Sequence, residues 1–72
     1  MQEIQLGRVY RHFKGDYYLV EAVAHDSETG ALCVIYRKLY GDGGLWVRPA
    51  AMWLETVTRD GVTKPRFTYI GE

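Results

Sequence analysis

Apolar and polar residues alternate in short runs along this chain, which is the pattern of β-strands that bury one face. The longest run spans residues 17–25. Its even positions are aromatic, small or apolar: Tyr18, Val20, Ala22 and Ala24. Its odd positions include Glu21 and His25. We therefore predict a strand over 17–25 whose even-numbered side chains face the core.

Four further strands are predicted, at residues 8–13, 31–39, 45–48 and 66–70. The segments at 14–16, 26–30, 40–44 and 59–61 are rich in Gly and Asp, which favour tight turns. Pro49 is suited to open one helical turn over 49–53, because proline is tolerated at the first helical position. Residues 31–39 are apolar on both faces, so we expect that strand to be central or strongly bent.

Five short strands, three tight hairpins and one helical turn predict a single all-β domain over residues 1–72. The expected fold is a small five-stranded SH3-like barrel, or else a strongly curled antiparallel sheet with the same helical turn. Closure into a barrel would remove most exposed strand edges, which matters in so small a β protein.

Charge adds one refinement to this picture. Nine Lys and Arg residues balance nine Asp and Glu residues, whereas proteins that rely on non-specific phosphate attraction usually carry a basic excess. The basic residues are unevenly spread: six basic and four acidic residues lie in 37–72, against three and five in 1–36. The second half can therefore hold a local basic patch.

The lone cysteine excludes an internal disulfide, and small secreted domains usually have several. No segment approaches the roughly 20 apolar residues of a membrane span, and no basic-then-apolar leader is visible at the start. We therefore expect a cytoplasmic protein without a membrane partner.

Catalytic and metal-binding chemistry is sparse. Cys33 lies between Leu32 and Val34 in a predicted strand, so we expect it to be buried and inert rather than paired with His12 or His25. A closed zinc site needs four ligands, and the chain has no C-x-x-C or H-x-x-x-H pattern. The glycines of 41–44 lack the Lys-Ser/Thr and the helix of a phosphate loop. We predict no catalytic residue, no metal site and no cofactor.

Several segments together resemble a small bacterial family of unknown function, numbered 1653. The segments are YRHFKG (10–15), SET (27–29), VIYRKLYGD (34–42), WVRP (46–49) and PRF (65–67). Trp53 stands where the resemblance leads us to expect Phe, a change that should leave the fold intact. The resemblance implies a bacterial cytoplasmic protein and no particular reaction, substrate or cofactor.

Arginines interleave with aromatic residues in adjacent predicted strands. Arginine binds phosphate or carboxylate with two parallel hydrogen bonds, and exposed aromatic rings stack on bases or on extended peptides. The candidate ligand-binding residues are Arg37, Tyr40, Trp46, Arg48, Arg66, His12 and Tyr10. Protonation of His12 or His25 below about pH 6.5 would strengthen anion binding. Whether Trp46 and Tyr36 face the core or the solvent decides whether this set is a site.

The sequence thus predicts a non-catalytic binding module for an anionic or extended polymer, such as single-stranded RNA or a peptide. One alternative is a protein-interaction or oligomerising domain that uses an open strand edge. Another is a small enzyme that acts on an anionic substrate through His12 or His25. A small-molecule pocket usually encloses about 300 Å³ or more, for which so short a chain has little room.

Overall fold

The computed structural model describes residues 4–71, which form seven strands and one short helix. Five strands make one antiparallel sheet in the order β4-β3-β2-β1-β7. Their bounds are β1 (Val9–His12), β2 (Tyr17–His25), β3 (Leu32–Lys38), β4 (Leu45–Pro49) and β7 (Phe67–Gly71). The all-β prediction is confirmed, and all three predicted hairpins are present.

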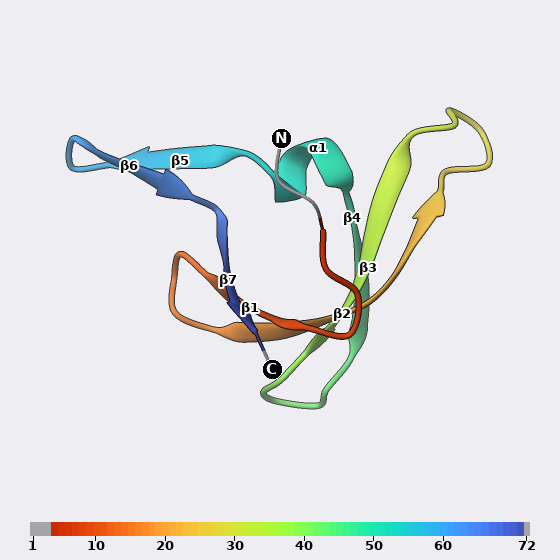
Figure 1. Ribbon diagram of the computed structural model, residues 1–72, viewed down its shortest axis with the longest axis horizontal. Helices are drawn as coiled ribbons and strands as arrows, with labels where there is room; N and C mark the ends of the chain where they lie inside the picture. The colour runs from red at the N-terminus through yellow and green to blue at the C-terminus, as the bar shows by residue number, and fades with distance from the viewer. Residues whose placement is uncertain (1–3, 72) are drawn as a thin grey trace.

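The sheet is open, with β4 and β7 as its edges, so the SH3-like barrel is not confirmed. It curls instead, as Figure 1 shows, and two irregularities accompany the curl. One lies in β2, where the register with β3 shifts between Val20 and Ala22. The other lies where β1 pairs with β7. Bulges of this kind bend a strand and increase its twist, which gives the sheet a concave face.

The bulge at Glu21 corrects the predicted alternation along β2. Before it, Val20 pairs with Tyr36 on the face that carries the core, as predicted. After it, Val23 rather than Ala22 pairs with the buried Val34. Ala24, predicted to face the core, is exposed. One extra residue in a strand moves every later side chain to the opposite face.

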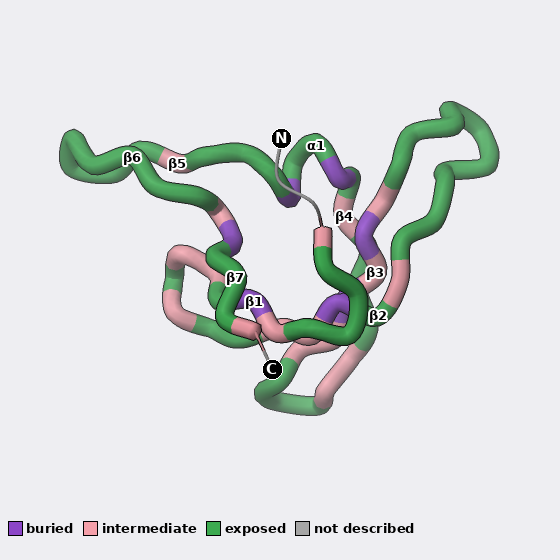
Figure 2. The backbone as a smooth tube through the Cα atoms, viewed as in Figure 1, coloured by how far each residue is buried: buried purple, intermediate pink, exposed green. Residues whose placement is uncertain are grey.

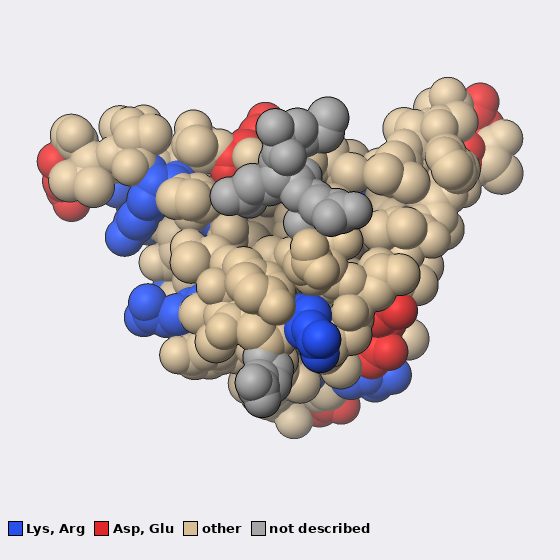
Figure 3. Space-filling view, in the orientation of Figure 1, with Lys and Arg blue, Asp and Glu red and all other residues tan. Residues whose placement is uncertain are grey.

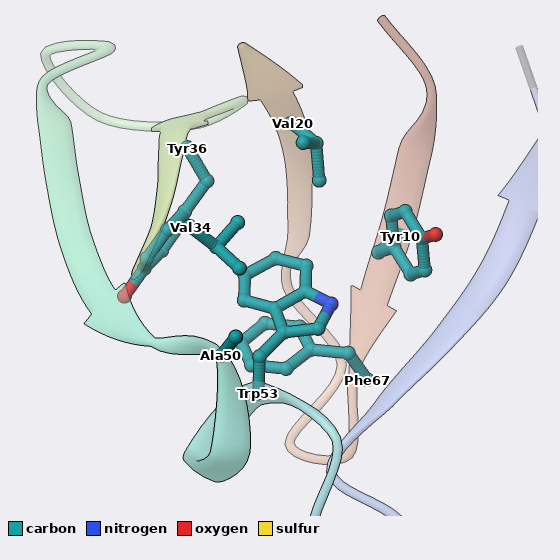
Figure 4. Close-up of a cluster of buried hydrophobic side chains, with 7 residues drawn as sticks. All are labelled: Tyr10, Val20, Val34, Tyr36, Ala50, Trp53 and Phe67. Atoms are coloured by element: carbon teal, nitrogen blue, oxygen red, sulfur yellow. The ribbon is translucent and has the colours of Figure 1, made fainter. Parts of the chain in front are cut away.

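The core lies between the concave face of the sheet and the helix α1 (Ala50–Trp53). Pro49 ends β4 and caps α1, and the helix brings Trp53 back over the sheet. The Trp53 indole stacks on the ring of Phe67, with centroids 3.6 Å apart and an angle of 7° between the planes (Figure 4). The buried residues are Tyr10, Val20, Val34, Tyr36, Ala50, Trp53 and Phe67. Trp53 is 2% exposed, so it is a central core residue.

The remaining strands, β5 (Thr56–Arg59) and β6 (Val62–Pro65), form a separate two-stranded sheet that the sequence analysis missed. Only the turn at Asp60-Gly61 was predicted. Both residues have positive φ, 53° and 77°, as a two-residue hairpin turn requires. The hairpin projects from the body of the protein and is exposed along almost all of its length (Figures 1 and 2). The prediction of five strands is therefore wrong by one hairpin.

The two ends of this hairpin meet at its base. The Arg66 amide donates to the carbonyl oxygen of Glu55 (2.9 Å), and the Arg66 guanidinium pairs with the Glu55 carboxylate (3.1 Å). The stacked rings of Trp53 and Phe67 lie just beyond these residues. The hairpin is therefore closed at its base beside the core.

The helix α1 is the only helix in residues 4–71. With a single turn it is far too short to cross a bilayer.

Candidate functional site

A hollow of about 230 Å³ opens beside the β4 edge of the sheet. We call it the aromatic hollow, and its lining residues are Tyr18, Tyr36, Lys38, Tyr40, Trp46 and Arg48. Tyr18 lies opposite Lys38, and Tyr36 lies opposite Trp46. Residues directly opposite each other in an antiparallel pair project from the same face. The hollow therefore continues the concave, core-bearing face past the area that α1 covers.

Trp46 and Tyr36 divide between surface and core. The Trp46 side chain is 55% exposed, whereas Tyr36 is buried. The Tyr36 ring packs against Trp53, with centroids 5.0 Å apart, and its hydroxyl accepts a hydrogen bond from Nε of Arg48 (3.3 Å). Tyr36 thus joins the hollow to the core, and Trp46 is the more exposed of the two residues.

Two tyrosines join across the hollow. The hydroxyls of Tyr18 and Tyr40 are hydrogen-bonded at 2.7 Å, and their rings meet edge to face. Burial, and then the hydrogen bond with Tyr40, raise the pKa of Tyr18 above its ordinary value of 10. Tyr18 therefore stays uncharged near neutral pH, so it contributes a ring and a polar hydroxyl.

Two cations border these rings. Nζ of Lys38 lies 5.2 Å from the Tyr40 centroid and 5.7 Å from the Trp46 centroid, within the range of cation–π attraction. It also pairs with the Asp42 carboxylate (3.2 Å), and this bond and the Gly44 amide lower the pKa of Asp42. Arg48 forms no salt bridge with a carboxylate of residues 4–71. The lining therefore carries two cations and no carboxylate of its own.

His12 lies next to the hollow rather than in it. Its ring centroid is 6.2 Å from that of Tyr18. Burial, and then the positive charges of Arg48, Arg66 and Lys14, lower the pKa of His12 below its ordinary value of 6.5. Cationic His12, which was predicted to form below about pH 6.5, therefore forms only at a lower pH.

Besides His12, three more of the predicted ligand-binding residues lie outside the hollow. Tyr10 is 4% exposed and packs against Trp53, so the core hides the ring that was predicted to contact a ligand. Arg37 follows Tyr36 in β3 and so points to the other face, where it pairs with Glu21 (2.9 Å). Arg66 is held by Glu55 at the base of the β5–β6 hairpin. Tyr40, Trp46 and Arg48 are the predicted residues that the fold brings together.

Lys38 and Tyr18 were not singled out from the sequence. A signal for Lys38 was present, because Lys38 follows Tyr36 by two residues in the same predicted strand and so shares its face. Tyr18 had no comparable signal, since its place depends on its pairing with Lys38 across the β2–β3 hairpin.

The two histidines named in the enzyme hypothesis lie at opposite ends of β2. His12 lies where β1 meets the start of β2, and His25 ends β2. Within residues 4–71, no three His, Cys, Asp or Glu side chains are grouped to hold a metal ion. Cys33, predicted to be buried, is partly exposed.

A second hollow, of about 390 Å³, lies between Phe13 and the β5–β6 hairpin. Its other lining residues are Arg59, Asp60, Val62 and Lys64. Cζ of Arg59 lies 5.5 Å from the Phe13 centroid. In the view of Figure 3 acidic and basic side chains are interspersed, and basic atoms gather beneath this hairpin. Of the basic residues in the second half of the chain, Lys38 and Arg48 line the aromatic hollow and Arg59 and Lys64 line the second hollow, whereas Arg37 and Arg66 line neither.

Comparison with known proteins agrees with the resemblance seen in the sequence. Residues 8–69 match the family model described as "Protein of unknown function (DUF1653)". The fold is similar to the crystal structure of a DUF1653 protein from Bordetella bronchiseptica, with a TM-score of 0.86 and 41% sequence identity. The match covers 99% of this chain and 92% of that one. No curated protein matches the chain.

Proposed function

This chain belongs to the DUF1653 family, whose description assigns no function, and we propose that it binds single-stranded RNA through the aromatic hollow. The observation that carries the proposal is the exposed Trp46, which lines one hollow together with Lys38 and Arg48. Proteins that bind single strands combine aromatic stacking platforms with basic groups along the backbone.

Each lining residue has a role in this proposal. A base stacks on Trp46, and the edge of the base meets the hydroxyls of Tyr18 and Tyr40. Phosphates on either side of the base meet Lys38 and Arg48, and Arg48 is already oriented by the Tyr36 hydroxyl. Single strands fit better than duplexes, because the faces of paired bases are covered by their neighbours.

The size and charge of the hollow favour part of a polymer over a small molecule. Its volume of about 230 Å³ is below the roughly 300–1,000 Å³ of most small-molecule sites. A ligand that places one unit in the hollow and continues along the surface suits such a space. A cationic ligand is disfavoured, because Lys38 already lies against the rings and Arg48 is nearby.

The test is a titration of labelled protein with a short mixed-sequence single-stranded RNA at low salt, followed by amide chemical shifts. We expect saturable shifts at Tyr40, Trp46 and Arg48, and quenching of Trp46 fluorescence. Absence of shifts at millimolar RNA would refute the proposal. Trp46→Ala should require a higher RNA concentration for the same shifts, while Tyr17→Ala removes an exposed ring on the opposite face and should leave the titration unchanged.

A further inference from the structure

The β5–β6 hairpin has two faces of different chemistry. In its register, Val57 lies opposite Lys64 and Arg59 lies opposite Val62. Residues that lie opposite each other, or two apart in one strand, project from the same face, so one face carries two valines and two cations. Threonine hydroxyls on the other face hydrogen-bond to each other across the hairpin (2.8 Å). The basic face is turned toward Phe13, because both of its cations line the second hollow beside that ring.

The second hollow carries more positive than negative charge. Arg59 and Lys64 line it together with one carboxylate, that of Asp60. A third cation adjoins them, since Nζ of Lys14 lies 5.9 Å from the Phe13 centroid and Cζ of Arg59 lies 5.5 Å from it. The three cations are exposed, and within residues 4–71 none of them forms a salt bridge. They are therefore available to an anionic ligand.

His12 connects the two hollows. Its ring centroid lies 4.5 Å from that of Phe13 and 6.2 Å from that of Tyr18, which lines the aromatic hollow. Burial is the largest cause that lowers the pKa of His12, and cations from both hollows lower it further, Arg48 from one and Lys14 from beside the other. Positive charge thus lies on both sides of His12, along two short steps that lead from the aromatic hollow to the second hollow.

The second hollow suits a flexible polyanion better than a single small anion. Tight sites for one anion usually rely on backbone N–H groups or on a helix N-terminus. Here the cations stand on exposed side chains, two of them on the projecting hairpin of Figure 1, where salt screens each contact. A polyanion gains from the number of such contacts, because each neutralised phosphate releases counterions. The backbone of a single strand has this property.

We propose that an RNA strand bound in the aromatic hollow continues past His12 into the second hollow, where Arg59 and Lys64 contact its phosphates. This extension rests on the function proposed above, because the strand is positioned by the base held at Trp46. Cation–π contact with Phe13 holds the Arg59 guanidinium on the side of the hairpin that the strand reaches. The β5–β6 hairpin then serves as an arm that lengthens the binding surface.

Salt dependence tests the two added contacts, with a single strand of about ten nucleotides, within the range of single-strand sites. The contacts at Lys38 and Arg48 alone predict a slope of about −1.4 for the logarithm of the association constant against the logarithm of salt concentration, and two more contacts make it about −2.8. Arg59→Gln and Lys64→Gln should each reduce its magnitude by about 0.7. Arg8→Gln is the matched control and should leave the slope unchanged, because Arg8 is also exposed and lines neither hollow.

Strand length gives a second readout. Amide chemical shifts of labelled protein are compared between the longer strand and a dinucleotide that carries a terminal phosphate, which fills only the aromatic hollow. We expect both ligands to shift Trp46, and only the longer strand to shift Phe13, Arg59 and Lys64.

The outcomes separate the extension from the function on which it rests. Shifts confined to the aromatic hollow with both ligands, or an unchanged slope in both hairpin variants, overturn the extension and leave the proposed function intact. Equal shifts at the hairpin with the dinucleotide indicate a separate anion site and also overturn the extension. Absence of shifts with either ligand refutes the proposed function, and the extension with it.

Discussion

The two tryptophans lie on the same side of the sheet yet have opposite environments. Trp53 is sealed between α1 and the sheet and stacked on Phe67, whereas Trp46 stands at the open end of that face. A layer of aromatic rings runs from Trp53 into the hollow that Trp46 lines, since Tyr36 contacts Trp53 on one side and Tyr18 on the other. One layer of rings thus serves as core where α1 covers it and as a candidate binding surface where the cover ends.

The largest expected effect is on the covered end. Trp53→Ala should lower the free energy of unfolding by about 3–5 kcal/mol, the usual cost of removing a buried aromatic side chain. So large a loss would leave so small a domain partly unfolded. Urea denaturation followed by circular dichroism measures the change. Trp46→Ala is the comparison variant, with an expected change of about 0.5 kcal/mol or less because Trp46 is exposed. Equal destabilisation by the two substitutions would remove the distinction between the ends.

The open end should show the reverse pattern in RNA binding. Trp46→Ala should weaken binding by about 1–3 kcal/mol, the range found for loss of one base–aromatic stack. Fluorescence anisotropy of a labelled single strand measures the affinity. Tyr17→Ala serves as the control, and a similar loss in that variant would mean that the contact is non-specific.

The contribution of the basic side chains to RNA binding can be distinguished from that of the Trp46 ring by the salt dependence of the affinity. Two phosphate contacts, at Lys38 and Arg48, predict a slope of about −1.4 for the logarithm of the association constant against the logarithm of salt concentration. Arg48→Gln should reduce the magnitude of this slope by about 0.7, whereas the exposed Arg8→Gln should leave it unchanged. An unchanged slope in Arg48→Gln would remove Arg48 from the phosphate contacts.

The smallest expected effect is a pH dependence of the free energy of unfolding that comes from His12, which contacts Phe67 in the core and Tyr18 in the hollow. Burial and nearby cations lower the pKa of His12 in the folded protein, so the unfolded chain binds its proton more tightly. The stabilisation from neutral His12 is thus complete above about pH 6.5 and is lost as pH falls below that value. Denaturant melts between pH 7.5 and pH 5 measure it. His12→Gln should reduce this acid sensitivity more than His25→Gln does, and equal curves for the two variants would contradict the prediction.

The hairpins could be predicted from the residues of their turns, whereas the orientations of the side chains depend on contacts between residues far apart in the sequence. The Gly and Asp residues at 14–16, 26–30 and 40–44 define turns within a few residues, so β1 to β4 could be placed. The orientations of Trp46 and Trp53 depend on how Pro49 and α1 fold the chain back over the sheet. The shift at Glu21 has no local marker, and it reversed the predicted faces beyond Val20.

The candidate site shows the same division. Trp46, Arg48 and Tyr40 lie within nine residues of each other, and one hairpin brings them together. Tyr10, Arg37 and Arg66 lie apart from the hollow, because residue type alone does not show which face a side chain takes or which acid it pairs with. The β5–β6 hairpin escaped notice because its strands are exposed on both faces and lack alternation, although Asp60-Gly61 is a strong hairpin signal.

The closed base of the β5–β6 hairpin makes it a natural place to modify the protein. Because Glu55 and Arg66 already hold its ends together, a graft between them adds little loop-closure entropy and leaves the sheet unchanged. We expect the tip at Asp60-Gly61 to accept a fluorescent label or an inserted epitope, with an unchanged thermal midpoint as the check. The domain can therefore be labelled or immobilised through residues 56–65 while the environments of Trp46 and Trp53 stay unchanged.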